Sequence, residues 1–217
     1  GIFVDKASYG INIVCRGTCV GQNDGNSNGA GVYVNGVVKD GVMTFSGSTE
    51  GTAGAGMYIA GNFKVIIYGA RVIGSNIGIE QRAGKLYIVD SRIEGGTEEE
   101  ATMTPNGSGS TSENCAVAIA QHTTKFPIDV IIRSSTLIGN AAFFEGNPQN
   151  NPDATKDTSI VIESGAFVGD IKTLADTDCT GFLYGGHYSK EPDAKYIAKG
   201  YEAVADTKET FNVVKKS

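Results

Sequence analysis

The chain has 217 residues, of which 30 are glycine and 5 are proline, and its formal net charge is −6 with a pI near 5.0. This length suffices for one large core or for one solenoid with a cap. The acidic balance and the lack of a Lys/Arg-rich stripe argue against nucleic-acid binding, and no apolar run is long enough to span a membrane. The chain begins GIFVD, without Met or a secretion signal, and we therefore expect it to be a piece of a longer protein.

A short apolar strand recurs six times along the chain, and each copy is followed by a tail of small and apolar residues that ends in glycine. The strands are INIV (11–14), VMTF (42–45), VIIY (65–68), LYIV (86–89), VIIR (130–133) and IVIE (160–163). The tails end at Gly21, Gly51, Gly74, Gly95, Gly139 and Gly169. A unit of this size cannot bury its own apolar face, so it must stack on its neighbours.

An earlier strand precedes each of these copies, and its alternate residues are apolar. These strands are IFVD (2–5), VYVN (32–35), MYIA (57–60), IGIE (77–80), VAIA (117–120) and AFFE (142–145). The alternation predicts inward pairs such as Val32 with Val34, Val42 with Thr44, and Ala142 with Phe144. Repeats of 21 to 23 residues leave no room for a helix in each coil, and β-propeller blades need about 40 residues. The pattern therefore predicts an all-β fold, a right-handed parallel β-helix of six to seven coils over residues 1–190.

Three polar segments interrupt the repeat and are expected to protrude from its corners: 23–29, 97–114 and 147–157. They are either tolerated surface insertions or the flanks of a binding face. The last segment, 191–217, is expected to form a C-terminal α/β cap made of a short helix that begins at Pro192 and a hairpin.

The cap region GGHYSKEPDAKYIAKGYEAVADTKETFNVV resembles a module that closes many secreted or wall-attached β-helix proteins of gut Firmicutes. The family pattern is roughly GG-x-[FY]-S-x-[DE]-P-x-x-Y-[IVL]-A-x-GY-x-AV followed by T-[FYW]-x-V. The matching residues are Gly185, Gly186, Tyr188, Ser189, Pro192, Tyr196, Ile197, Ala198, Gly200, Tyr201, Ala203, Val204, Phe211 and Val213. Similar modules occur in phage fibre or decoration proteins. The resemblance implies an extracellular or cell-surface location, with a virion as the alternative.

Enzymes with a β-helix fold hold clustered carboxylates in a groove along one strand row. Here Asp5 and Glu80 follow the first strands of coils three apart, or roughly 14 Å, which exceeds the separation of a glycosidase pair. Glu80 with Arg82, and Asp90 with Arg92 and Glu94, are interpreted as exposed ion pairs. His122 and His187 are interpreted as surface histidines.

The cysteines, Cys15, Cys19, Cys115 and Cys179, lack zinc-site spacing, and only Cys15 and Cys19 are close enough in sequence for a disulfide. Most are expected to be small buried side chains. The sequence predicts neither a metal nor a cofactor.

Two outward surfaces are candidate binding sites. Phe3, Tyr33 and Tyr58 would form an aromatic ladder on consecutive coils, on which sugars could stack, with Glu80 as the fourth member of this set. The second strands carry apolar residues at outward positions, which predicts a subunit contact. These positions include Met43, Phe45, Ile66, Tyr68, Tyr87 and Ile131.

We therefore expect a non-catalytic, surface-associated structural or adhesion module that binds host or bacterial glycans. The alternatives are a phage fibre or decoration protein that forms a homotrimer, and a polysaccharide lyase or glycoside hydrolase of the β-helix type.

Overall fold

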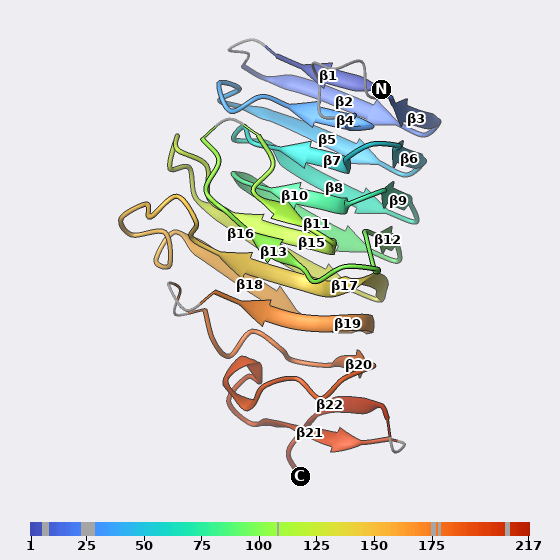
Figure 1. The fold of residues 1–217 in the computed structure, drawn as a ribbon, viewed down its shortest axis with the longest axis vertical. Coiled ribbons are helices and arrows are strands. Elements are labelled where there is room, and N and C mark those ends of the chain that lie inside the picture. The colour runs from blue at the N-terminus through green and yellow to red at the C-terminus, as the bar shows by residue number, and fades with distance from the viewer. Residues whose placement is uncertain (6–8, 23–28, 108, 175–176, 178, 207–208) are drawn as a thin grey trace.

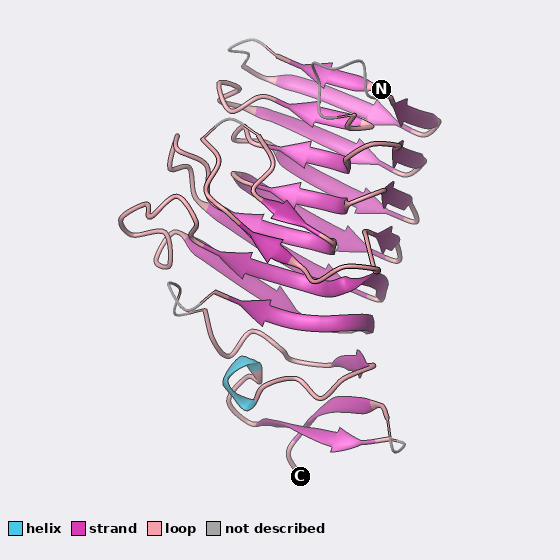
Figure 2. Ribbon diagram, in the orientation of Figure 1, coloured by secondary structure: helices cyan, strands magenta, loops and turns pink. Residues whose placement is uncertain are grey.

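The computed structural model describes residues 1–217 except 6–8, 23–28, 108, 175–176, 178 and 207–208. The fold is all-β. Its parallel strands are stacked coil upon coil, in sequence order from the N-terminus to the C-terminus (Figures 1 and 2). One sheet has 14 strands and a second has six. The 14-stranded sheet contributes two rows that meet at the long strand β17, and together with the second sheet this makes three rows. This arrangement is compatible with a parallel β-solenoid.

The first row consists of β1 (Ile2–Val4), β4 (Val32–Val34), β7 (Ala55–Ile59), β10 (Ile77–Gln81) and β15 (Cys115–Ala120). The second row consists of β2 (Ile11–Cys15), β5 (Gly41–Phe45), β8 (Lys64–Tyr68), β11 (Gly84–Val89), β16 (Ile128–Arg133) and β18 (Thr158–Ile162). The third row begins with β3 (Thr18–Gly21), β6 (Ser48–Gly51), β9 (Arg71–Gly74) and β12 (Arg92–Glu94). Strands β17 (Ser135–Gly146) and β19 (Gly165–Thr173) run from the third row into the first row of the following coil.

The core lies between the three rows, where each coil places an apolar side chain on its counterpart in the next. In the second row Val65, Leu86, Val130 and Ile160 are aligned in register and buried. Burial of each such side chain contributes about 1.5–3 kcal/mol. The recurring tail glycines lie at the corner between the third row and the next first-row strand. A Cβ at Gly51 or Gly74 would overlap the carbonyl oxygen of Ala55 or Ile77, respectively, so this corner requires glycine.

The predicted inward pair Val42 and Thr44 is wrong by one residue. Strand β5 starts at Gly41, and its register aligns Met43 with Ile13 and Val65. Met43 and Phe45 are therefore fully buried, whereas Val42 and Thr44 are partly exposed on the outer side. Met43 and Phe45 therefore cannot form the predicted subunit contact, because their side chains are part of the core.

A second correction concerns β17. The pairing of β17 with β19 shifts register between Ile138 and Ala141 and again between Ala141 and Phe143. An irregularity of this kind changes which side chains face inward. Phe143 consequently lies in the main core together with Ala142, and Phe144, predicted to point inward, packs in a separate outer cluster.

The C-terminal cap forms as a hairpin, but its predicted helix is a single 3-10 turn, η1 (Ala194–Tyr196). Ile197 is extended and pairs with Leu183 of the last coil, which draws the chain out of a helical conformation. The hairpin consists of β21 (Tyr201–Ala205) and β22 (Phe211–Lys215), and β22 pairs antiparallel with β20 (Gly186–Tyr188). Tyr188 stacks on Phe167 with ring centroids 4.8 Å apart and so joins the cap to the core. No helix among the described residues is long and apolar enough to cross a membrane.

Candidate functional site

One column of outward positions on the first row carries most of the residues expected to bind a ligand. In register, it runs Phe3, Tyr33, Tyr58, Glu80, Ala118, Phe144 and Lys172. The four expected glycan-binding residues are thus consecutive members of one column. Their exposure differs sharply, because a loop covers part of the column.

The aromatic ladder forms as expected. Phe3 stacks on Tyr33 with centroids 4.9 Å apart, and Tyr33 stacks on Tyr58 at 5.1 Å. Tyr33 is therefore sandwiched, and only the edge of its ring is open to solvent. Phe3 is 58% exposed, and no described aromatic ring stacks on its other face. The ring face available to a sugar in this ladder is therefore the outer face of Phe3.

Tyr58 lies under the segment 97–114 and is only 1% exposed. Its hydroxyl donates to the Gly109 carbonyl at 3.2 Å and accepts a hydrogen bond from Arg82 Nη1 at 3.1 Å. The expectation that Tyr58 is an open stacking surface is therefore wrong. The covering segment contains a small antiparallel pair, β13 (Thr102–Met103) and β14 (Ser112–Glu113), and it passes over β10 and β15 (Figure 1).

Arg82 is fully buried and fastens this segment to the first row. Its guanidinium donates to the carbonyls of Gly109 at 2.6 Å, Asn106 at 3.0 Å and Ala120 at 3.3 Å, in addition to Tyr58. An arginine can donate five hydrogen bonds in a fixed planar arrangement, which suits it to gathering several carbonyl groups.

Glu80 is also fully buried, and we call Glu80 and Arg82 together the clamp. Its Oε1 accepts hydrogen bonds from the amide and the hydroxyl of Thr111, both at 2.8 Å, and lies 3.7 Å from Arg82 Nε. Burial raises the pKa of this carboxyl group, while the Thr111 amide and the Arg82 charge lower it. The expected exposed ion pair is thus a buried one, and Glu80 cannot reach a ligand in this conformation.

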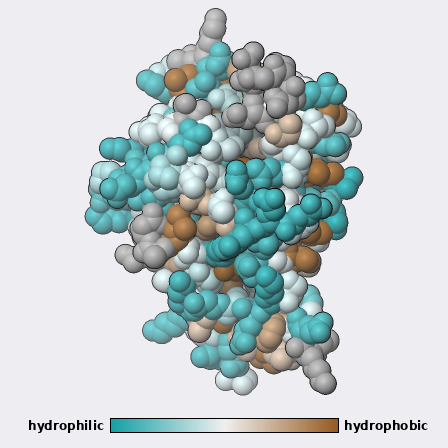
Figure 3. All heavy atoms as spheres, viewed as in Figure 1, coloured by the Kyte–Doolittle hydropathy of each residue, from teal (hydrophilic) through white to brown (hydrophobic). Residues whose placement is uncertain are grey.

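The clamp also seals a second apolar cluster outside the main core. Its buried members are Ala55, Tyr58, Ala60, Ile77, Ala101, Cys115, Ala118, Ala141 and Phe144. The largest insertion therefore behaves as a fixed cover for the first row rather than as an exposed corner loop. Figure 3 shows the face seen in Figure 1 as mostly polar, with separate small apolar areas.

His122 lies beside this clamp and is buried, so its interpretation as a surface histidine is wrong. The ring packs against Gly36 so closely that a Cβ there would overlap it. The Asn151 amide donates to the His122 carbonyl at 3.0 Å, and Gln149 donates to the Asn106 carbonyl. The Gln149 contact joins the insertions 97–114 and 147–157, and the Asn151 contact joins the second of them to the turn after β15. His187, by contrast, lies at the cap and is partly exposed, with Nδ1 3.0 Å from Asn212 Oδ1.

The outer side of the second row presents the other candidate surface. Ile66, Tyr87 and Ile131 are in register and partly exposed, and Tyr68 is 57% exposed. Charged residues flank this apolar stripe. Lys64 Nζ lies 5.3 Å from the Tyr87 ring centroid, Lys85 pairs with Asp129 at 3.6 Å, and Arg133 pairs with Glu163 at 2.5 Å.

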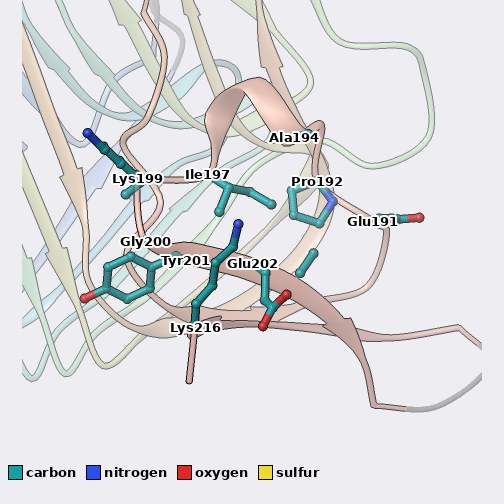
Figure 4. Close-up of a pocket in the computed structure, with 11 residues that line it drawn as sticks. Glu191, Pro192, Ala194, Ile197, Lys199, Gly200, Tyr201, Glu202 and Lys216 are labelled. Atoms are coloured by element: carbon teal, nitrogen blue, oxygen red, sulfur yellow. The ribbon is translucent and has the colours of Figure 1, made fainter.

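A hollow of about 460 Å³ lies in the cap between η1 and β21 (Figure 4). Its lining includes the apolar residues Pro192, Ala194 and Ile197 and the charged residues Lys199, Glu202 and Lys216. The side chains at its rim carry both signs of charge, and the hollow is open to solvent. In the part of the chain that the structure describes, no group of three or more His, Cys, Asp or Glu residues could hold a metal ion.

Comparison with protein-family models, with curated protein sequences and with solved structures found no match to this chain. Sequence reasoning missed Thr111, which donates to Glu80 from the loop. It named Arg82 and His122 but interpreted them as exposed, and so missed their place beneath the loop and beside it. The alternation of Glu80 and Arg82 places both side chains on one side of their strand, and this was the available signal. The acceptors on the loop are main-chain carbonyls, which have no sequence signature.

The clamp makes Arg82→Met a sharp test of how the loop is held. The variant leaves the Glu80 carboxylate buried without a cation and removes four hydrogen bonds, so we expect a loss of about 3–5 kcal/mol. Amide exchange of the segment 104–113 should accelerate, because Arg82 no longer holds the Asn106 and Gly109 carbonyls against the first row. Arg133→Met, which removes an exposed ion pair screened by solvent, should change the free energy of unfolding little and leave that exchange unchanged. Equal exchange in both variants and the wild type would show that Arg82 does not hold the loop.

His122 predicts a pH dependence of stability. Burial and the nearby Arg82 charge lower the pKa of His122 from 6.5 to about 4, so the folded state binds a proton less readily than the unfolded state. The free energy of unfolding should therefore carry the full contribution of neutral His122 above pH 6.5. It should decrease by about 2–3 kcal/mol as the pH falls towards 4. Urea denaturation of the wild type at several pH values in this range measures the slope. His122→Gln should flatten it and His187→Gln should retain it; the same slope in all three proteins would assign it to other groups.

Proposed function

We propose that this chain is a non-catalytic, extracellular structural and adhesion module built as a right-handed parallel β-helix, and that it binds glycans at the end of its aromatic ladder. The stacked parallel rows support the architecture. The resemblance of the cap sequence to modules of secreted and wall-attached proteins supports the location.

The observation that carries the non-catalytic assignment is the enclosure of Glu80 and Arg82. The carboxylate at the centre of the first-row column is fully buried beneath the loop, with two hydrogen bonds from Thr111 and an arginine beside it. A catalytic acid or base must reach the proton that it transfers within hydrogen-bonding distance. In this arrangement both charged groups hold the loop against the sheet, which favours a rigid scaffold.

The glycan-binding part of the proposal depends on Phe3. An aromatic ring offers a sugar apolar area and a π surface, and a ring supported from behind is preorganised for such contact. Phe3 has Tyr33 stacked behind it and Tyr58 behind that. Asp5 and Asn35 directly follow β1 and β4, two residues after Phe3 and Tyr33. They are joined by a hydrogen bond of 3.0 Å and carry polar groups that suit sugar hydroxyls.

A glycan array followed by titration of the best ligand tests this assignment. Phe3→Ala should weaken binding about three- to tenfold, the equivalent of about 0.5–1.5 kcal/mol of ring contact. Tyr68→Ala removes an equally exposed ring from the second row and should leave binding unchanged. Equal affinities of the Phe3→Ala variant and the wild type would refute the site. Tyr58→Ala is unsuitable for this purpose, because it would open the outer apolar cluster.

The second candidate function is a fibre or decoration protein that forms a homotrimer. The apolar stripe on the second row favours it, because a sheet side that faces water normally carries polar residues. Met43 and Phe45 are buried and so are not part of this surface. Its exposed and partly exposed residues are Ile66, Tyr68, Tyr87 and Ile131.

Sedimentation equilibrium at several concentrations distinguishes the two candidates. A fibre protein is expected to be a trimer throughout, and Ile131→Lys should dissociate it by placing a charge in the contact. Val168→Lys, on the exposed side of the third row, is the matched control and should remain trimeric. A monomeric wild type at every concentration would exclude this candidate.

A further inference from the structure

Two cysteines share the first corner of the coil stack. Cys15 ends β2 and Cys19 lies in β3, and their sulfur atoms are 3.5 Å apart. Both side chains point towards the core: Cys19 is buried in it, and Cys15 is half-buried against it. The other two cysteines, Cys115 and Cys179, lie elsewhere in the fold, and Cys115 belongs to the outer cluster.

The backbone of this corner is held in place by the next coil. The Ser46 amide donates to the Cys15 carbonyl at 2.9 Å, and the Ser48 amide donates to the Gly17 carbonyl at 3.1 Å. The two corners are in such close contact that a Cβ at Gly47 would overlap the Gly17 carbonyl. The approach of the two sulfur atoms is therefore set by the stacking of the coils and does not depend on a free loop.

Every later coil fills the same two corner positions with residues that cannot form a covalent bond to each other. The register places Phe45 and Thr49 there in the second coil, followed by Ile67 with Val72 and Ile88 with Ile93. The side chains beside the first corner are also less buried than in the next coil: Ile11 and Ile13 are half-buried, where Met43 is fully buried. The cysteines thus occupy a corner whose neighbouring side chains are less enclosed than those of the next coil.

We propose that Cys15 and Cys19 form a disulfide that closes the first corner and secures the N-terminal coil. The bond requires an oxidant, which we assign to the class of low-molecular-weight disulfides. The Cys15 thiolate attacks one sulfur of oxidised glutathione and releases one glutathione thiolate, which gives a mixed disulfide. The Cys19 thiol then loses its proton and attacks the Cys15 sulfur, which releases the second glutathione. In total two protein thiols are oxidised and one glutathione disulfide is reduced to two thiols.

The order of these two steps follows from exposure. Cys15 is the more accessible sulfur, whereas burial and the hydrogen bond to Cys15 raise the pKa of Cys19 to about 11. The attack on the external disulfide therefore belongs to Cys15, and Cys19 is the resolving thiol. A disulfide stabilises mainly by restricting the unfolded chain, and its effect here is expected to concentrate on the first coil.

Peptide mapping tests the bond directly, because Arg16 lies between the two cysteines. The native protein is incubated with oxidised glutathione, remaining thiols are alkylated, and trypsin is added. A disulfide links the tryptic peptides 7–16 and 17–39 into one species two hydrogen masses lighter than their sum, and reduction separates them. Non-reducing electrophoresis must show a monomeric chain, which places the link within one molecule.

Two variants make the result decisive. In Cys15→Ser, Cys19 should remain alkylatable, and the linked peptide should be absent. Cys179→Ser removes a cysteine outside the corner and should retain the linked peptide. Oxidation should also slow amide exchange in β2 and β3 of the wild type and not in Cys15→Ser. Full alkylation of both cysteines after incubation, or a glutathione adduct on Cys15 that persists in the folded protein, would overturn the proposal. The glycan-binding experiment is read independently of this one, so failure of either leaves the other intact.

Discussion

The fold depends on one constraint: every coil must stack on its neighbour in register, at the spacing of about 4.8 Å that parallel strands share. Each inward side chain then meets its counterpart one coil away, so the sequence must repeat apolar residues at matching positions. The same constraint fixes the corners. At Gly51 and Gly74 the following strand passes so close that no side chain fits. Additional residues can therefore enter only at corners, which is where the insertions 97–114 and 147–157 leave the stack; the predicted insertion 23–29 lies largely outside the described residues.

An insertion that leaves a corner must still satisfy its own polar groups. The segment 97–114 does so by folding back on the first row, where Arg82 collects its carbonyls and Glu80 accepts from Thr111. Burial of two charges is costly unless each is well hydrogen-bonded. Arg82 donates four hydrogen bonds and Glu80 Oε1 accepts two, whereas Glu80 Oε2 is buried without a hydrogen-bond partner among the described residues. As a result, Glu80 and Arg82 are enclosed beneath the segment, whereas Phe3 in the same column is 58% exposed.

The strand rows and their corners could be predicted from the sequence, because the period-two alternation and the corner glycines are local signals. The errors occur where local signals are ambiguous or absent. In VMTF both alternations are apolar enough to face inward, so only pairing with Ile13 and Val65 decides that Met43 is buried. The register shift in β17 likewise leaves no mark in the sequence. Tyr58 and Glu80 were assigned to an open surface because their burial depends on main-chain carbonyls and on Thr111, some 30 to 50 residues away along the chain.

The first coil concentrates the functional and structural questions in one place. A ring that recognises a ligand must be held still, yet the side chains of this coil are less buried than those of the next: Ile11 and Ile13 are half-buried, where Met43 is fully buried. Phe3 is steadied by Tyr33 on one side of the coil, and Cys15 meets Cys19 at the opposite corner. The same coil thus joins the most exposed ring of the ladder to a corner where a covalent bond would restrict the chain. The glycan contact proposed for Phe3 and the disulfide proposed for this corner therefore share one physical requirement, which is a coil whose backbone is held still.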